Sequence, residues 1–443
     1  MKTRALALTT SLVLSLPATA LAAAGSGSSG YSGGGGGGGS YSGGGGSYSG
    51  GGSGGGEGSL GGFLVFVAIV VGIIVWALIT TALEQRRIRR RDARVTTASA
   101  EAAQDDAYLA ADAVKRDAAT LFKEIQRAWT DNDTARLGTM VGPDLMKEWS
   151  LRLADFERKG WKNVVKVLNE PDVKYVGLVN REDDTEDRVV VLMEAQLEDY
   201  VQMKGGGRMN ANGESDATKT LKEYWTLGRT QHGWMLLSIE TGEEGKHHLS
   251  SDIVATPWDD TQRLRDQSLV EGAVADKVAE GFTVAEVADL DFDGDARAAA
   301  LDLSLADARF APDILEAAAR RAVAAWAEAV DGEDRELEAV ADAQAIQELL
   351  HPGDPSGRTR LVVRGPQIRA VRIVALDAGA QPPAMTIEVD VTGTRYVQNR
   401  DTAAVVAGSD TGQADFSERW TMTLSGPDEQ PWRLAGVAGA ALR

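Results

Sequence analysis

Residues Glu223–Trp234 read EYWTLGRTQHGW, with two tryptophans on either side of a turn at Gly233. A second stretch, ERWTMTLSGPDEQPW from Glu418 to Trp432, opens with the same Glu-x-Trp-Thr pattern and also ends in tryptophan. Aromatic and β-branched residues around a glycine-containing turn are typical of β-hairpins. Each stretch is therefore predicted to close an antiparallel sheet, with strand pairs Thr218–Arg229 and Trp234–Glu240, and Asp415–Leu424 and Pro431–Val437.

Other features recur in the same order along the chain. Trp129 in RAWTDND matches Trp326 in AAWAEAVDGED, and the tripeptide YVQ begins at Tyr200 and again at Tyr396. The interval from the first of these tryptophans to the hairpin tryptophan is 96 positions in one half and 94 in the other. Ordered matches at nearly equal spacing indicate an internal duplication.

The spacing of apolar residues predicts helices before strands in both halves. Val114, Leu121 and Trp129 recur at helical intervals, whereas residues 188–198 alternate like a strand with one face partly open to water. Helices followed by an antiparallel sheet make an α+β arrangement. The other predicted elements are helices over Asp144–Lys159 and Pro312–Asp331, strands over Asp172–Val179, Gln367–Leu376 and Met385–Thr392, loops over Lys204–Ser215 and Asp401–Gln413, and connector helices from Asp259, over Val284–Asp289 and over Ala296–Ala308.

The first 59 residues predict export followed by a flexible arm. Residues 1–22 have a basic start, an apolar stretch and then small residues, which is the order of a secretory signal peptide. Residues 23–59 form a Gly/Ser-rich arm, and 21 of the chain's 50 glycines lie within residues 25–58. This arm has almost no apolar surface to bury, so it is predicted to be disordered.

Residues 62–83 are predicted to form a transmembrane helix. The stretch Phe63–Leu83 has no charge and contains 14 Leu, Ile, Phe or Val residues, and roughly 20 apolar residues span a bilayer as a helix. Six arginines follow in the basic juxtamembrane segment and stalk, residues 84–111. They are also expected to contact lipid headgroups, and they are Arg86, Arg87, Arg89, Arg90, Arg91 and Arg94.

The arginine cluster also predicts sidedness, because clustered basic residues mark the cytoplasmic side of a span. The expected location is the plasma (inner) membrane, crossed once, with the C-terminal body in the cytoplasm and the glycine-rich arm outside. If the signal peptide is retained, the chain crosses twice and the body still lies inside.

Composition excludes several classes of site. The chain has no cysteine, so disulfides, thiolate metal sites and cysteine nucleophiles are excluded. The residues after 96 carry 38 basic against 62 acidic side chains, and so acidic a body repels phosphate backbones, which argues against nucleic acid as a partner.

No metal or cofactor is predicted. His247 and His248 adjoin Lys246, whose charge opposes a cation, and they are assigned to a surface turn. Asp291–Asp302 imitates a calcium loop, but it has Ala296 where such a loop needs glycine. A helix start capped by acidic residues is the preferred interpretation of that segment.

The candidate site residues either line a pocket or form the hairpin core. Trp225 and Trp234 are interpreted as stabilising cross-strand neighbours in preference to pocket walls. Glu223 and Glu418 lie two positions before a tryptophan and so share its sheet face. Each is either a base with a raised pKa or, as preferred, the partner of an arginine in its own hairpin, Arg229 or Arg433. The full candidate set is Trp129, Tyr200, Glu223, Trp225, Arg229, Trp234, Trp326, Tyr396, Glu418, Trp420 and Trp432.

The first half resembles the C-terminal domain of Tim44, the scaffold of the mitochondrial import motor, and its bacterial relatives. The resemblance is carried by LFKEIQRAWTDNDTARL, residues 121–137, and by LKEYWTLGRTQHGWMLLSIE, residues 221–240. Bacterial relatives also have a signal peptide, a glycine-rich tract and one span before the domain. The second half fits less closely, since Ser425 stands nearest the place of the family's hairpin arginine. The family positions filled here are Trp129, Asp133, Trp225, Thr226, Arg229 and Trp234.

The resemblance implies a fold like nuclear transport factor two. The chain would then hold two tandem cone-shaped modules, residues 112–242 and 312–440, each with N-terminal helices packed on a curved antiparallel sheet. A mainly helical connector, residues 243–311, would join them behind the transmembrane helix.

The resemblance also implies attachment rather than catalysis. The mitochondrial relative holds chaperone and translocase partners at a membrane, but this chain lacks its long charged N-terminal region. The expected function is a membrane-tethered, non-catalytic scaffold that recruits a protein or peptide partner, linked to protein translocation or membrane-protein handling. The alternatives are a pocket-bearing enzyme or small-molecule binder of the same cone fold, and an arm that works outside while the modules anchor it. The oligomeric state is not predicted.

Overall fold

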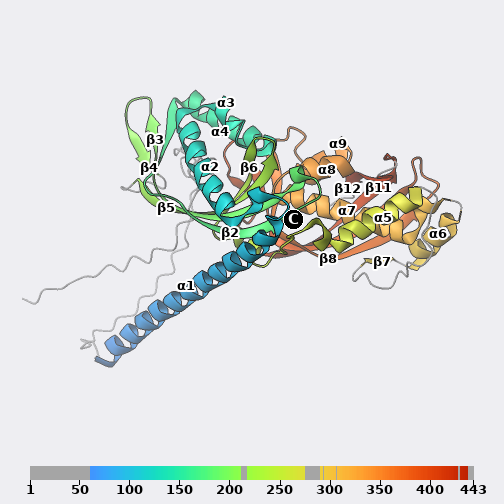
Figure 1. Cartoon of the computed structure of the whole chain (residues 1–443), viewed down its shortest axis with the longest axis horizontal. Helices are drawn as coiled ribbons and strands as arrows, with labels where there is room; N and C mark the ends of the chain where they lie inside the picture. Colours follow the sequence, from blue (N-terminus) through green and yellow to red (C-terminus); the bar gives the residue numbers. More distant parts are fainter. Residues whose placement is uncertain are drawn as a thin grey trace, which may run out of the picture.

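The structure is a computed structural model that describes residues 60–210, 217–274, 290–292, 294–305, 307–427 and 430–437. The signal peptide, the glycine-rich arm and the helix predicted over Val284–Asp289 lie outside these residues. The described chain is α+β, as predicted, with two mainly antiparallel sheets and helices that precede each sheet in the sequence (Figure 1).

The first sheet is built around one long strand, β3 (Arg188–Met203). One edge of β3 pairs with β2 and then β1, and the other edge pairs with β5 and then β4. The predicted hairpin is confirmed, since β5 pairs with β6. The bounds of these strands are β1 Trp161–Val167, β2 Asp172–Val179, β4 Arg208–Asn210, β5 Thr218–Thr230 and β6 Gly233–Thr241.

The side chains of β3 alternate between its two faces, and near the start of the strand both faces are buried. Val189 and Val191 face the main core beneath the helices, whereas Val190 and Leu192 form a second apolar cluster with Ile88 on the opposite face. The prediction that this second face is partly open to water is confirmed at its polar end, where Gln196 is exposed. Its apolar end is covered by the helix that contains Ile88, from outside the predicted module.

Three helices, α2 (Ala111–Asp131), α3 (Thr134–Leu137) and α4 (Pro143–Lys159), precede the first sheet. The apolar stripe predicted for α2 is confirmed, because the buried side chains of this helix include Val114, Ala118, Leu121, Phe122, Ile125 and Trp129.

In the second sheet, β9 (Ala384–Asn399) is central. It pairs with β8 along one edge and with β11 and β10 along the other, while β12 closes the hairpin with β11. A short strand, β7, adds to the outside of β8 in parallel. The bounds are β7 Leu290–Phe292, β8 Thr359–Asp377, β10 Val405–Gly408, β11 Ala414–Leu424 and β12 Trp432–Val437, after helices α7 Pro312–Asp331, α8 Arg335–Val340 and α9 Ala343–Leu350.

The two halves share small details of backbone pairing. Val141 forms an isolated bridge with Leu236 just before α4, and Ala341 forms the same kind of bridge with Leu434 just before α9. They differ where the first half breaks between β1 and β2 at Pro171, because β8 runs on as one strand with a register shift near Gly365.

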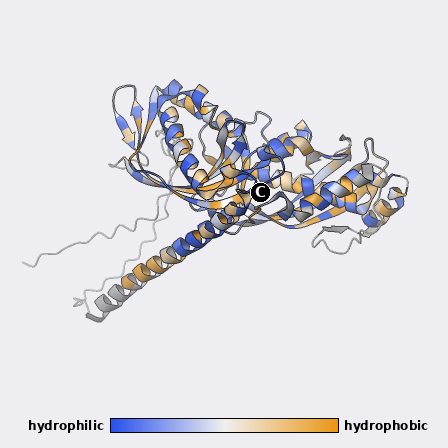
Figure 2. Ribbon diagram, viewed as in Figure 1, coloured by the Kyte–Doolittle hydropathy of each residue, from blue (hydrophilic) through white to orange (hydrophobic). Residues whose placement is uncertain are grey.

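Helix α1 (Leu60–Ala102) projects from the body as one continuous helix of 43 residues (Figure 1). Its side chains are described from Val71 onward, and most apolar ones from there to Leu83 are exposed. In Figure 2 the projecting part of this helix is coloured orange, for hydrophobic residues. Farther along, Ile88 and Val95 are buried against the body. Among the described residues, no helix combines the length and the apolar character needed to span a bilayer.

The connector contains α5 (Thr261–Val274), as predicted from Asp259, and α6 (Gly294–Ser304), which begins within the segment that imitates a calcium loop and ends two residues beyond it. Four strands were predicted in each half, but the described residues form six strands in each sheet. The missed strands are β1, β4, β7 and β10, each seven residues or shorter. Segments this short carry little periodicity, and β10 lies within the predicted loop 401–413.

Candidate functional site

The same tryptophan–glutamate contact occurs in both hairpins. Trp225 Nε1 donates to Glu223 Oε2 at 3.0 Å, and Trp420 Nε1 donates to Glu418 Oε2 at 3.1 Å. All four side chains are buried. Residues two positions apart share a sheet face, which is why each pair meets as predicted.

The two glutamates differ in their second partner. Glu418 Oε1 accepts from Arg395 Nη2 at 2.9 Å, whereas Glu223 Oε1 has no hydrogen-bond partner among the described residues. Burial accordingly raises the pKa of Glu223 to about 8. The pKa of Glu418 is also raised by burial, against the opposing charge of Arg395.

The arginine partners predicted for these glutamates were wrong. Arg229 stacks over the ring of Tyr108, with its guanidinium carbon 4.0 Å from the ring centroid. Arg433 Nε donates to Asp342 Oδ1 at 3.1 Å. Both arginines lie near the turn of their hairpin, too far along the strand to reach the glutamate.

Glu223→Gln is expected to flatten the pH dependence of stability. The folded protein holds a proton on Glu223 that the unfolded chain releases above the ordinary pKa of 4.5, so stability falls as pH rises from about 4.5 to about 8. Glutamine keeps an acceptor for Trp225 and removes this loss, which is on the order of a few kcal/mol. Urea unfolding below and above this pH window measures it.

Glu418→Gln is the matched control, because it removes a charge that Arg395 already balances. That variant is expected to lose stability at neutral pH. Equal pH slopes for wild type and Glu223→Gln would contradict the buried, protonated state of Glu223.

The other candidate tryptophans lie in the cores. Trp129 Nε1 donates to Asn163 Oδ1 at 2.7 Å, and Trp432 Nε1 donates to the Arg309 carbonyl at 2.9 Å. The ring of Trp326 lies 5.2 Å from that of Trp420, and Trp234 packs edge-on against Tyr108. Of these tryptophans, only Trp432 also lines the cleft described below. These contacts fit the hairpin-core interpretation rather than an open pocket.

The two candidate tyrosines make different kinds of contact. The guanidinium carbon of Arg208 lies over the Tyr200 ring, 4.4 Å from the ring centroid. Tyr396 Oη donates to Glu244 Oε1 at 2.9 Å, and this bond joins the second sheet to the segment that follows the first.

Five of the six arginines after the predicted span are exposed: Arg86, Arg87, Arg89, Arg90 and Arg94. Arg91 differs, because it is only 2% exposed and its Nε donates to the Val176 carbonyl at 2.6 Å. The prediction that Arg91 contacts lipid headgroups is therefore wrong. Its guanidinium fixes α1 to the edge of β2 instead.

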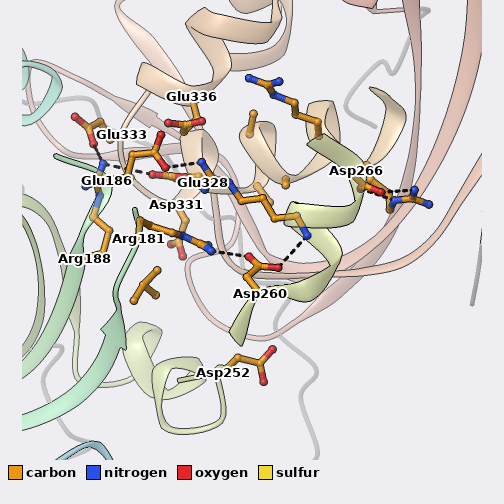
Figure 3. Close-up of a pocket in the computed structure, with 18 of the residues that line it drawn as sticks. Arg181, Glu186, Arg188, Asp252, Asp260, Asp266, Glu328, Asp331, Glu333 and Glu336 are labelled. Atoms are coloured by element: carbon orange, nitrogen blue, oxygen red, sulfur yellow. Dashed lines mark hydrogen bonds and ion pairs between the residues drawn. The ribbon is translucent and has the colours of Figure 1, made fainter. Parts of the chain in front are cut away.

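A hollow lies between the two halves of the described chain. It has a volume of about 850 Å³ and is lined by β2, β3 and β6 on one side and by α5 and α7 on the other. Ion pairs cross it or border it, including Arg181 Nη1 to Asp260 Oδ2 at 2.6 Å and Arg188 Nη2 to Glu333 Oε2 at 2.7 Å (Figure 3).

The lining of this cleft is acidic and partly apolar. Ten carboxylates and five guanidinium groups line it. Val190 and Leu237 of the first sheet, Ile314 and several alanines of α7 supply apolar surface between the charges. Sequence reasoning missed the cleft because its walls come from segments far apart in the chain.

A cluster of titratable side chains lies at one end of the cleft. His247 Nε2 lies 2.7 Å from Glu240 Oε2, and His248 Nε2 lies 2.6 Å from Glu240 Oε1. Asp331 Oδ2 is 3.6 Å from His247 Nε2. The prediction of a surface turn for these histidines is wrong, because Glu240 is buried and the second half of the chain covers His247, with Gly365 against its Cβ.

In this cluster burial favours the neutral forms of Glu240 and His247, but their attraction to each other favours the charged forms more strongly. Burial alone would raise the pKa of Glu240, yet the two imidazoles hold it well below its usual value. Burial alone would lower the pKa of His247, yet the Glu240 carboxylate raises it.

The fold defines an α+β protein with helices packed on curled antiparallel sheets. A family model described as the Tim44-like domain matches residues 95–241. This part of the chain is a Tim44-like domain, and the resemblance drawn from its helix and hairpin is confirmed. No curated protein matches the chain.

Two solved structures are similar to parts of the chain. The crystal structure of the intermembrane space region of the chloroplast protein ARC6 matches at 16% identity with a TM-score of 0.23, covering 29% of this chain and 95% of that one. An Ntf2-like protein involved in plasmid conjugation matches at 7% identity with a TM-score of 0.17, covering 70% of this chain and 88% of that one. Scores this low support no conclusion about fold or function.

Proposed function

We propose that this protein is a membrane-tethered scaffold that holds a protein or peptide partner at the cytoplasmic face of the plasma membrane. The observation that carries the proposal is α1, a single helix with two different surfaces. From Val71 to Leu83 it exposes apolar side chains, and from Ile88 onward it packs against the body. We infer that the apolar part of this helix lies in a bilayer while the following part is fixed in the folded body.

The proposed scaffold has two tandem modules, residues 112–242 and 312–440, that arose by duplication. The shared order of helices and strands, the matching bridges before α4 and α9, and the repeated tryptophan–glutamate bond support this. A Tim44-like domain in the first half supports a binding role.

The proposed docking site is the cleft between the halves. An excess of carboxylates over guanidinium groups favours a cationic partner. The alanines and Ile314 of α7 favour apolar residues between the partner's charges. The partner class proposed is therefore a basic, amphipathic peptide segment of another protein.

Photocrosslinking in intact cells tests this site. A photoreactive residue in place of Gln267, which lines the cleft, is expected to capture a protein with a basic segment. The double variant Glu271→Lys and Glu336→Lys reverses two cleft charges and is expected to reduce capture at least tenfold, which corresponds to about 1.4 kcal/mol.

Two controls separate the cleft from the general surface. A photoreactive residue in place of Gln344, exposed on α9 outside the cleft, is expected to capture different proteins. Glu157→Lys with Glu338→Lys makes the same charge change at exposed positions outside the cleft and is expected to leave capture at Gln267 unchanged. Equal loss in both double variants would refute docking in the cleft.

The alternative function is an enzyme or small-molecule binder, and Glu223 is the observation that favours it. A buried carboxyl with a raised pKa and an unpartnered oxygen fits a general base. Glu223 does not line the cleft, which favours the scaffold. Turnover by the purified chain that Glu223→Gln abolishes would support the enzyme.

A further inference from the structure

The cluster at the end of the cleft has the composition of a divalent metal site. Glu240, His247 and His248 each offer one ligand atom, and these atoms all lie within 4.8 Å of one another. Zinc binds imidazole nitrogen and carboxylate oxygen at about 2.0–2.2 Å, so two ligands on one ion stand roughly 3–4 Å apart. Only small side-chain adjustments are then needed to bring all three onto one ion.

Three separate elements hold these side chains in place. Glu240 is near the end of β6, and both histidines lie in the short 3-10 helix Glu244–Leu249 that follows. The rings of the two histidines lie with their centroids 3.9 Å apart and their planes tilted by 40°. From the other half of the chain, Gly365 approaches so closely that a Cβ there would lie 2.8 Å from the His247 Cβ.

The charges around the cluster also suit a divalent ion. Asp331 adds a second carboxylate beside His247, and the guanidinium of Arg364 lies on the far side of Asp331, with Nη1 3.3 Å from its Oδ1. With neutral imidazoles, the two carboxylates and this guanidinium sum to one negative charge. Two carboxylates against one guanidinium therefore offer net negative charge to a divalent ion, whose binding changes the sum from one negative to one positive charge.

We propose that Glu240, His247 and His248 bind a divalent transition-metal ion of the zinc class, with Asp331 flanking the remaining coordination position. Two imidazoles and a carboxylate are ligands that Zn²⁺ accepts, whereas Mg²⁺ and Ca²⁺ prefer oxygen alone. Metal binding would replace the contacts that the two Nε2 atoms make with Glu240.

The cleft supplies a route for the ion. Glu240, His248 and Asp331 all belong to its lining, so the ligands are reachable from solvent while Glu240 remains buried. Because Asp331 ends α7, whereas Glu240 lies in β6 and the two histidines follow that strand, a bound ion also ties the two halves together. Metal binding is therefore expected to stabilise the fold by mass action.

Metal retention by the full-length chain in detergent tests the site. After treatment with a chelator and dialysis against Zn²⁺, the wild type is expected to retain one ion per chain and to melt at a higher temperature. Mg²⁺ is expected to have no such effect. The variant His247→Gln with His248→Gln is expected to bind Zn²⁺ more than about 100-fold more weakly.

His232→Gln is the matched control, because His232 is exposed in the turn of the first hairpin; it is expected to bind like the wild type. If the double variant does not fold, the visible absorption of Co²⁺ in the wild type decides, since tetrahedral nitrogen and oxygen ligands give it a strong band. Zn²⁺ retention that is equal in wild type and double variant, or a wild type without retained ion or Co²⁺ band, would show that these histidines bind protons only.

Discussion

A chain that carries Val71→Asp, Ile74→Asp and Leu78→Asp is expected to lose its membrane attachment. Each substitution replaces a residue that favours insertion by about 0.3–0.6 kcal/mol with one that opposes it by about 2.5–3.5 kcal/mol. Three of them shift the balance by about 10 kcal/mol, which exceeds the roughly 4–8 kcal/mol that the 14 strongly apolar residues supply. Carbonate extraction of membranes, followed by detection of the C-terminal body, measures the result.

The same variant tests sidedness. A signal peptide starts export and a following span stops it, so losing the span is expected to send the body across the membrane. Protease added to spheroplasts is then expected to digest the variant body and to spare the wild-type body. Thr96→Asp, Thr97→Asp and Ala100→Asp change exposed positions farther along α1 and are expected to leave attachment intact. A wild-type body digested from outside would refute the proposed topology.

Trp225→Ala is expected to destabilise the protein by about 3–5 kcal/mol. The indole is fully buried against Phe122, with ring centroids 5.1 Å apart, and its removal leaves a cavity between α2 and the sheet. It also removes the only hydrogen bond to Glu223 among the described residues. Denaturant unfolding measures this effect as a lower midpoint.

Trp420→Ala is expected to lose somewhat less stability, because Glu418 keeps its bond to Arg395. Trp258→Ala supplies the control, since this tryptophan is 72% exposed and its loss is expected to change stability by no more than about 0.5 kcal/mol. A Trp225→Ala protein as stable as Trp258→Ala would contradict the core role of the hairpin tryptophan.

Long, strongly periodic segments could be predicted from the sequence. The apolar stripe from Val114 to Trp129 gave α2, and the helix over Pro312–Asp331 matches α7 at both ends. Alternation over β3 and β9 gave the central strand of each sheet. Periodicity succeeds there because one buried face imposes a regular spacing on the residues that fill it.

The candidate site could be predicted only in part. The bond between Trp225 and Glu223 follows from a two-residue spacing, which is local. The pairing of Glu418 with Arg395 joins different strands, and Arg395 reaches Glu418 diagonally, because the residue directly opposite Glu418 is Val389. Local spacing does not reveal such a contact. Arg91 was misassigned because its carbonyl partner, Val176, lies 85 positions away in the sequence.

The sequence by itself determined the α+β class and the main helices and strands, because these depend on spacing between neighbours in the chain. The Tim44-like segment was identified from its resemblance to a known family. The sequence also predicted a membrane span from the uncharged stretch Phe63–Leu83, since hydropathy is a sum over consecutive residues. Only the tertiary structure brought Glu240, His247, His248 and Asp331 together and opened a cleft between the halves. Those features depend on which surfaces of the two sheets and their helices come into contact. Side chains far apart in the sequence determine that contact.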